Sequence, residues 1–459
     1  MKYISKYFLG LSLMLAAGFS SCTGDLDVPP KDPNQDTPEK LFKNDPRGTM
    51  DRMLAECYQG LATAGYKGAG ESILGFGDPG AGTFTRTIFN LEELTTDHFS
   101  WLQFSDAGFY ELVTMAFAPD NEVMYAAYSR IYGEIALCNE FIRTIQQYRS
   151  YLADGDQAAA DDGIRQAKIL RSLAYFYAIS DFGSAGYVDE TSEAGAAPVQ
   201  YSRADLYNKV VSTLEEVSAE YGDTYTAPAY GYVGKEAADA LLARFYLNAG
   251  VFTGTPAYDK CWNICQKIIA HHQGAGFNNS GLADSYKALF GANNEQYAAQ
   301  GSRVNEILLT VPQDGINLQA YGGSTFYIAA CCGSADGISS LNDCNLNAQW
   351  TCMVAREQFS NQFGFDANGY TNDARAELWK TSKDGFEIGN STIMGNGGFA
   401  KGYAPLKYTN YAYDEFGNID TENSPNGSER SFADADWTVI RLAEIYLNAV
   451  EANVVGNVG

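Results

Sequence analysis

The sequence has little basic charge and little histidine. It contains 31 Lys and Arg against 56 Asp and Glu, which gives a formal net charge of −25. Phosphate backbones recruit clustered Lys and Arg, so this balance excludes a nucleic-acid partner bound by bulk electrostatics. The 459 residues contain 3 histidines and no C-x-x-C pair. Zinc sites need His and Cys ligands at short spacing, so we predict no zinc site; calcium is left open by the sequence, no metal ligand is assigned, and no motif indicates a cofactor.

Motifs of catalysis are also missing. There is no H-E-x-x-H and no phosphate-binding G-x-x-x-x-G-K-[ST], and the one G-x-G-x-x-G match, Gly75 to Gly80, contains Pro79 and reads as a turn. His271 and His272 end an amphipathic segment and are expected to cap it. Two opposed Asp or Glu side chains could always be found for a glycoside hydrolase, but their abundance is no evidence for one. We expect no enzyme, with an exported glycoside hydrolase as the alternative class.

Aromatic residues and glycine are plentiful. The chain has 31 Tyr, 25 Phe and 46 Gly, and 46% of its residues are hydrophobic, which can support a full core. A sugar ring presents an apolar face and a rim of hydroxyl groups, so its binding takes flat aromatic surfaces beside fixed donors and acceptors. The composition therefore favours a sugar-binding surface carried on loops.

The N-terminus reads as an export signal. Lys2 and Lys6 precede an apolar stretch from Phe8 to Phe19 that is too short for a membrane span, so residues 1–21 are predicted to be a signal peptide. The small residues before Cys22 resemble the lipobox of bacterial lipoproteins, which implies lipidation of Cys22; soluble secretion is the alternative. Residues 22–48 begin rich in Pro and Asp and are predicted to form a tether.

Helical periodicity dominates the rest of the chain and predicts an all-α fold. The periodic segments are 49–64, 121–149, 157–182, 203–220, 235–249, 257–271 and 435–455. Three of them carry Leu-Ala-x-x-Tyr, beginning at Leu173, Leu242 and Leu442, which is the spacing of a tetratricopeptide helix. We predict one domain, 49–459, of tetratricopeptide-like helix pairs. Its loop-rich insertions, at about 66–119 and 274–433, would form the ligand face.

Eight cysteines follow Cys22, and the sequence alone leaves their pairing open. Cys261 and Cys265 lie one helical turn apart, which is typical of two small core residues rather than of a ligand pair.

Three helical stretches carry a family resemblance. RQAKILRSLAYFYAISDFG at 165–183, ADALLARFYLNAG at 238–250 and WTVIRLAEIYLNA at 437–449, together with the lipobox-like start, resemble the SusD/RagB outer-membrane lipoproteins of Bacteroidetes glycan-uptake systems. The closest likeness is to the starch-binding members of that family. It rests on RTIFN at 86–90, EELTTD at 92–97, LNAGVFTG at 247–254 and YGGSTF at 321–326.

The resemblance implies an all-helical, non-catalytic binding protein. Such a protein is anchored by its lipid in the outer membrane and displayed at the cell surface. It holds starch-like α-glucan or malto-oligosaccharide for a SusC-like TonB-dependent transporter. Other family members bind different glycans or peptides, which is the alternative within the family.

The resemblance also places a ligand site. It maps an arginine that bonds sugar hydroxyls onto Arg86, and stacking rings onto Trp101, Tyr321 and Trp350. An amide position of the family falls on Asp106, a carboxylate that accepts hydrogen bonds but does not donate them. A second tryptophan of the family is replaced by Gln103.

Three ring contacts at about 0.5–1.5 kcal/mol each predict weak binding. If the chain were instead a scaffold for protein partners, the three rings should be buried and far apart. The sequence stops at Gly459 while the family continues, so we expect a truncated product whose last helix exposes an apolar face.

Overall fold

The structure is a computed structural model that describes residues 36–73, 80–103, 105–193, 197–298, 302–333, 343–388 and 399–459. The predicted signal peptide, Cys22 and most of the Gly75–Gly80 string lie outside these ranges. Among the described helices, none combines the length and apolar character needed to cross a bilayer.

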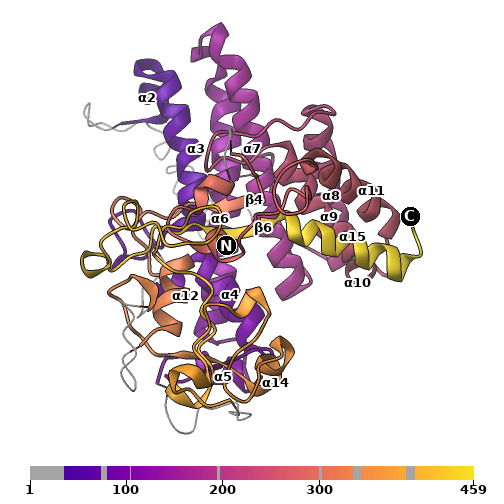
Figure 1. The fold of residues 1–459 in the computed structure, drawn as a ribbon. Coiled ribbons are helices and arrows are strands. Elements are labelled where there is room, and N and C mark those ends of the chain that lie inside the picture. The colour runs from indigo at the N-terminus through magenta and orange to yellow at the C-terminus, as the bar shows by residue number, and fades with distance from the viewer. Residues whose placement is uncertain are drawn as a thin grey trace, which may run out of the picture.

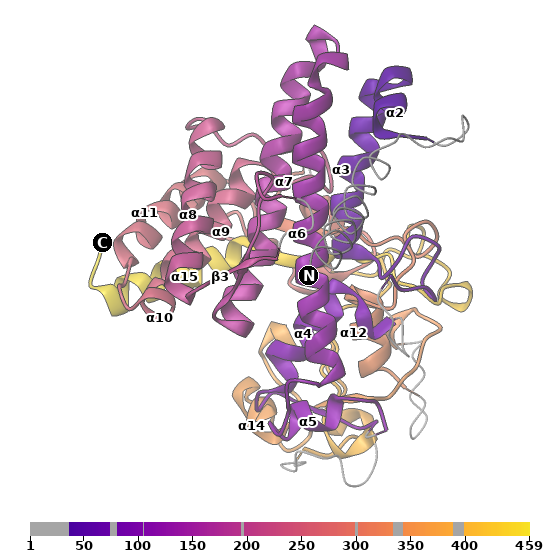
Figure 2. The same ribbon diagram turned by 180° about the vertical axis from the view of Figure 1, so that it is seen from behind.

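Long helices form a scaffold on one side of the molecule, which confirms the all-α prediction (Figures 1 and 2). They pack as neighbours in pairs: α6 with α7, α8 with α9, and α11 with α15. The scaffold helices are α2 (Pro38–Asn44), α3 (Pro46–Ala62), α6 (Glu122–Tyr148), α7 (Gln157–Tyr177), α8 (Arg203–Glu220), α9 (Lys235–Leu247), α10 (Ala249–Thr253), α11 (Tyr258–His272) and α15 (Leu442–Gly456). The last pair brings together segments separated by the long second insertion.

Helical structure begins earlier than predicted, inside the expected tether 22–48. Thr37 caps α2 by accepting a hydrogen bond from the backbone N–H of Lys40, and Asp45 caps α3 in the same way. A proline follows each cap, where its missing N–H costs nothing. Phe42 is completely buried and its ring stacks on Tyr148 of α6 at 5.3 Å, so this segment is fixed to the scaffold rather than free.

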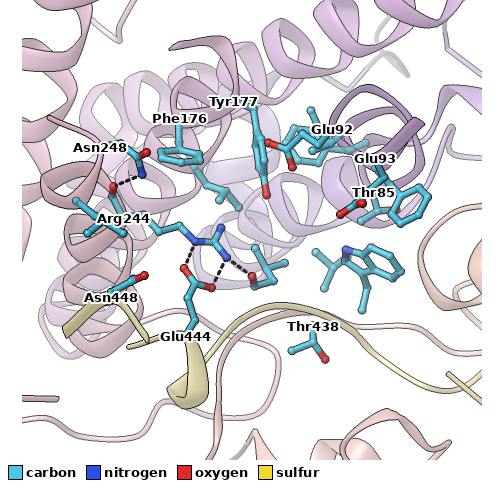
Figure 3. A pocket seen from close by; sticks show the side chains of 18 residues that line it. Thr85, Glu92, Glu93, Phe176, Tyr177, Arg244, Asn248, Thr438, Glu444 and Asn448 are labelled. Carbon is cyan, nitrogen blue, oxygen red and sulfur yellow. Dashed lines mark hydrogen bonds and ion pairs between the residues drawn. The ribbon is translucent and has the colours of Figure 1, made fainter. Parts of the chain in front are cut away.

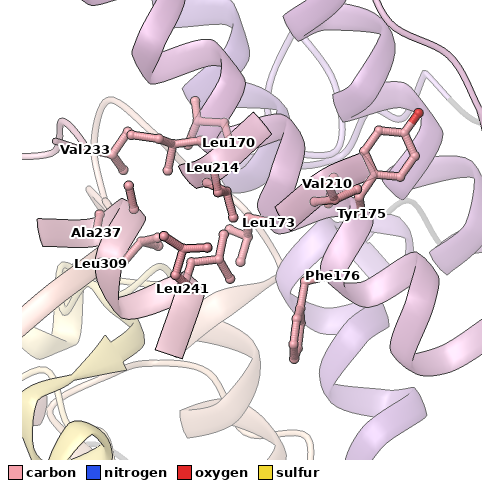
Figure 4. Close-up of a cluster of buried hydrophobic side chains, with 14 of the residues drawn as sticks. Leu170, Leu173, Tyr175, Phe176, Val210, Leu214, Val233, Ala237, Leu241 and Leu309 are labelled. Atoms are coloured by element: carbon pink, nitrogen blue, oxygen red, sulfur yellow. The ribbon is translucent and has the colours of Figure 1, made fainter. Parts of the chain in front are cut away.

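The scaffold core lies where α7, α8 and α9 meet (Figure 4). Leu170 and Leu173 of α7 lie three residues apart on one helix face, and both are buried. They belong to the same buried cluster as Leu214 of α8, Leu241 of α9 and Leu309 of the strand β4 (Ile307–Val311). The second insertion thus contributes a strand to the core of the helical scaffold.

The Leu-Ala-x-x-Tyr pattern marks a helix face buried against neighbouring helices in two of the three helices that carry it. In α7 and α9 the leucine, alanine and tyrosine of each pattern are all buried. In α15, Leu442 is buried but Ala443 and Tyr446 are only partly covered, and the Tyr446 hydroxyl donates to the carbonyl of Ser280. This third pattern lies at the edge of the helix array.

The predicted helix 435–455 is wrong at its start. Residues Trp437–Arg441 form the strand β6, which pairs antiparallel with β4, and α15 begins only at Leu442. Three consecutive β-branched residues, Thr438 to Ile440, favour the strand. One face of α15 packs on α9 and α11, while its other face exposes Leu447, Val450 and Val454.

The insertions form the second side of the molecule. The first holds α4 (Phe84–Leu94), β1 (Phe99–Trp101) and α5 (Phe109–Val113), and the second holds α12 (Gly323–Cys331), β5 (Met353–Ala355) and α14 (Glu357–Ser360). Figure 1 shows these elements gathered among loops, with α4 lying against the long helix α6. Strand β1 pairs antiparallel with β5, which joins the two insertions, while β2 (Ala185–Tyr187) and β3 (Val199–Tyr201) form a separate hairpin pair.

The cysteines divide into one pair and several buried thiols. Cys332 and Cys344 form a disulfide within the second insertion. Cys261 and Cys265 are fully buried with their sulfur atoms 4.0 Å apart, which confirms them as core residues.

Candidate functional site

A hollow of about 490 Å³ lies on the loop-rich side, between the two insertions. All five residues that the sequence assigned to a ligand site line it. The lining is Arg86, Trp101, Gln103, Asp106, Tyr321, Trp350 and Cys352, and we call it the surface hollow. These residues span 267 positions of the sequence, so only the tertiary fold brings them together.

The β1–β5 pair sets the positions of the two tryptophans. Trp101 is opposite Met353 in this ladder, and the backbone N–H of Leu102 donates to the Cys352 carbonyl at 2.7 Å. The backbone N–H of Trp350 donates to the Ala329 carbonyl, near the end of α12, at 2.8 Å. Backbone hydrogen bonds therefore hold both tryptophan-bearing segments against regular structure.

Arg86 projects from α4 into an aromatic surround. Its guanidinium carbon lies 4.8 Å from the ring centre of Phe326, 5.3 Å from that of Trp350 and 6.0 Å from that of Phe109. A guanidinium over ring faces gains cation–π attraction and is held in a fixed orientation. Arg86 is 4% exposed, so it supplies N–H donors at the bottom of the surface hollow rather than at its rim.

Trp101 supports the surface hollow from below. Its side chain is only 1% exposed, and its ring stacks on Phe109 at 4.5 Å and runs nearly parallel to Phe326 at 6.2 Å. Its indole N–H donates to Asp106 Oδ2 at 3.0 Å. In this arrangement Trp101 orients Asp106, and its covered ring presents little surface for stacking on a ligand.

Tyr321 and Trp350 form the open aromatic wall. Both are partly exposed, their ring centres are 6.0 Å apart, and their planes are inclined by 51°. Phe432 extends this wall, with its ring 4.9 Å from Tyr321. Two inclined rings present an angled surface, which suits a curved ligand better than a flat one.

The two glycines after Tyr321 allow close packing between α12 and α4. Both Gly322 and Gly323 are buried, and a Cβ on Gly322 would lie 2.1 Å from Thr83 Oγ1. Gly323 has φ of +55°, and its N–H donates to Thr85 Oγ1 at 2.9 Å. The lack of side chains here lets the start of α12 approach α4, so that Tyr321 and Arg86 line the same hollow.

Sequence reasoning missed the rings that support the site. Phe109, Phe326 and Phe432 each contact a lining residue. Phe326 lies inside the YGGSTF motif and could have been found there. No sequence signal distinguishes Phe109 or Phe432 from other phenylalanines.

The chemistry of the surface hollow suits a neutral polyhydroxylated ligand. Arg86 offers donors, Asp106 offers acceptors and Gln103 offers both. Asp106 is the one carboxylate among the described lining residues, whereas glycoside hydrolysis needs two facing each other. Burial raises the pKa of the Cys352 thiol to about 12, so this sulfur is not a nucleophile.

One group in the described chain has the composition of a metal site. Ligand atoms of Glu236, His271 and His272 lie within 4.8 Å of one another. Two of the three already satisfy each other, because His272 Nε2 and Glu236 Oε1 are hydrogen-bonded at 2.5 Å while buried. This contact ties the end of α11 to the start of α9, and His271 is exposed beside Tyr225.

Comparison with known proteins agrees with the fold. The sequence profile of the SusD family matches residues 356–457. The starch-binding protein SusD of Bacteroides thetaiotaomicron is 27% identical, with 98% of this chain and 81% of that protein covered.

Solved structures show the same architecture at lower identity. A SusD superfamily protein from Parabacteroides distasonis superposes with a TM-score of 0.60 at 17% identity, covering 90% of this chain and 77% of the other. A surface glycan-binding protein A from Bacteroides fluxus gives a TM-score of 0.59 at 16% identity, with 90% and 77% covered.

Proposed function

The chain belongs to the SusD family, and on this premise we propose that it is a non-catalytic glycan-binding lipoprotein of the outer-membrane surface. In this proposal Cys22 carries the lipid anchor and the surface hollow captures starch or malto-oligosaccharide. The protein then passes its ligand to a SusC-like TonB-dependent transporter.

One observation carries the proposal: five residues chosen from the sequence converge on a single open hollow. The alternative of a scaffold for protein partners would separate the aromatic side chains. The inclined rings of Tyr321 and Trp350 suit the curvature of an α-1,4-linked glucan, while Arg86 and Asp106 supply a donor and an acceptor for its hydroxyl groups.

A second ligand class within the family has support from two side chains. Asp106 and Gln103 replace an amide and a tryptophan of the starch-binding pattern, which changes both the polar and the stacking contacts. A glycan with other linkages is therefore the second candidate ligand. Measuring binding to the same panel of polysaccharides distinguishes it from starch.

The test is affinity electrophoresis of the mature protein in gels containing amylopectin, xyloglucan or an unrelated glycan. We expect retardation by amylopectin, and loss of most of it in Trp350→Ala. The matched control is Phe416→Ala, because Phe416 is 71% exposed and does not line the surface hollow. Retardation by xyloglucan alone would support the second candidate, and equal retardation of Trp350→Ala and the wild type would refute the site.

A further inference from the structure

A second cavity lies between the scaffold and the insertions. It measures about 400 Å³, within the range of roughly 300–1,000 Å³ typical of small-molecule sites. Its walls come from α4, α7, α9, β6 and α15, and Figure 3 shows its lining side chains. We call it the inner cavity. It shares α4 with the surface hollow but uses other residues of that helix.

One wall carries a fixed charged pair. Arg244 donates from Nε and Nη2 to the Glu444 carboxylate at 2.5 and 2.6 Å, and Nη2 also donates to the Val439 carbonyl. Figure 3 shows this pair facing the side from which Glu92 and Tyr177 enter. The bidentate contact neutralises both side chains and holds their geometry, so this wall is rigid before any ligand arrives.

A buried polar group on the inner cavity is left without a partner among the described residues, and a carboxylate open to solvent also lines the cavity. Asn448 is 6% exposed, and its Nδ2 has no hydrogen-bond partner among the described residues. Glu92 also lines the cavity; the residue is exposed, while desolvation of its carboxyl group by the surrounding protein raises its pKa to about 7. An unpaired buried amide destabilises the fold, so Asn448 gains from any acceptor placed in the cavity, and the ionised form of Glu92 gains from any donor placed there.

These groups are complementary to a ligand with both hydrogen-bond donors and acceptors. Asn448 Nδ2 needs an acceptor and Glu92 needs donors, and hydroxyl groups provide both. A simple ammonium ion would satisfy Glu92 but would leave Asn448 unpaired. The rings of Phe176 and Trp437 also border the cavity, and such rings suit the C–H face of a sugar.

We propose that the inner cavity binds a hydroxyl-rich molecule of one or two sugar rings, as a site separate from the surface hollow. Glu92 accepts hydroxyl protons, the Asn448 amide donates to a hydroxyl oxygen, and aromatic side chains contact the ring. Because hydroxyl donors stabilise the ionised carboxylate, the ligand lowers the pKa of Glu92, and its binding near pH 7 releases a fraction of a proton.

The test uses the full mature chain carrying both Trp350→Ala and Tyr321→Ala, so that the two rings that form the open wall of the surface hollow are removed. Maltose, D-glucose, glycerol and tetramethylammonium are titrated by calorimetry at pH 7 in two buffers of different ionisation enthalpy. We expect maltose or glucose to bind with proton release, and glycerol and tetramethylammonium not to bind. Absence of sugar binding in this background, or binding of tetramethylammonium instead, would overturn the proposal.

Two variants assign the signal to the inner cavity. In the same background, Glu92→Gln should abolish the proton release and weaken sugar binding roughly tenfold, and Asn448→Leu should weaken it similarly. Glu92→Gln keeps the side-chain volume, so it remains informative if Asn448→Leu unfolds. The matched control is Glu451→Gln, an exposed position on α15.

If Glu92→Gln left sugar binding unchanged, the site would be refuted, and the inner cavity would be assigned to bound water instead. Amylopectin retardation depends on the surface hollow, so its loss or retention in Trp350→Ala bears on the proposed function and not on this inference.

Discussion

Replacing Trp101 by phenylalanine separates two roles that this residue could have. The resemblance assigns Trp101 to stacking on sugar, whereas the structure covers its ring and directs its indole N–H to Asp106 at 3.0 Å. Phenylalanine keeps an aromatic ring against Phe109 but cannot donate this hydrogen bond. If Trp101 acts by orienting Asp106, the substitution should weaken ligand binding although the ring is retained.

The magnitude follows from the hydrogen bond that is lost. A bond to a charged group contributes about 1.5–3 kcal/mol, of which a mobile Asp106 recovers a part through water. We expect the affinity for maltoheptaose to fall about three- to tenfold in Trp101→Phe, measured by calorimetry. Asp106→Ala should weaken binding by a similar factor, and in that background Trp101→Phe should add less than about twofold, because the two residues act as a unit.

Full additivity of the two substitutions, or unchanged affinity in Trp101→Phe, would refute the orienting role. The matched control is Trp379→Phe, since Trp379 is 4% exposed but does not line the surface hollow. Urea unfolding of each variant shows whether the lost affinity reflects lost folding.

Three further predictions concern stability. Burial raises the pKa of Glu134 to about 8 from its usual 4.5, so the folded protein retains a proton that the unfolded chain loses. The contribution of Glu134 to the free energy of unfolding should therefore fall as the pH rises from about 4.5 to 8. In urea titrations, Glu134→Gln should lose less of its free energy of unfolding between about pH 5 and pH 8 than the wild type does. On α15, Ile445→Ala should lower the free energy of unfolding by about 2–5 kcal/mol because Ile445 is fully buried. Leu447→Ala should change it by less than about 0.5 kcal/mol because Leu447 is 69% exposed. Equal urea midpoints for the two variants would contradict the assigned faces of α15. Gly322→Ala should lower the free energy of unfolding by about 1–3 kcal/mol and weaken glycan binding, because its Cβ would clash with Thr83 Oγ1. Wild-type stability in thermal unfolding together with wild-type affinity in calorimetry would contradict the close approach of α12 to α4.

Helix positions were predictable because they depend on local periodicity. The segments predicted at 121–149, 203–220 and 257–271 agree with α6, α8 and α11 to within a residue at each end. The prediction failed at Trp437–Arg441, where the partner strand β4 lies more than a hundred residues earlier in the chain. A strand pair of such separation leaves no local signal apart from β-branched residues.

The ligand site was predictable as a set of residues but not as an arrangement in space. Arg86, Tyr321 and Trp350 could be named from motifs, and all three line the surface hollow. The burial of Trp101 could not be predicted, because it depends on Phe109 and on the antiparallel β1–β5 pair. The inner cavity had no sequence signature at all, since its polar groups, Glu92 and Asn448, come from helices at opposite ends of the chain.

The sequence by itself determined the helical class, the buried faces of α7 and α9, and which residue types could bind a sugar, because these follow from spacing along the chain and from side-chain chemistry. Only the tertiary structure decided which rings remain open to a ligand. Packing covers Trp101 and leaves Tyr321 and Trp350 accessible, and that difference arises from neighbours that are distant in sequence. The exposure of a side chain is a property of the whole fold, so it could not be read from the residues around it.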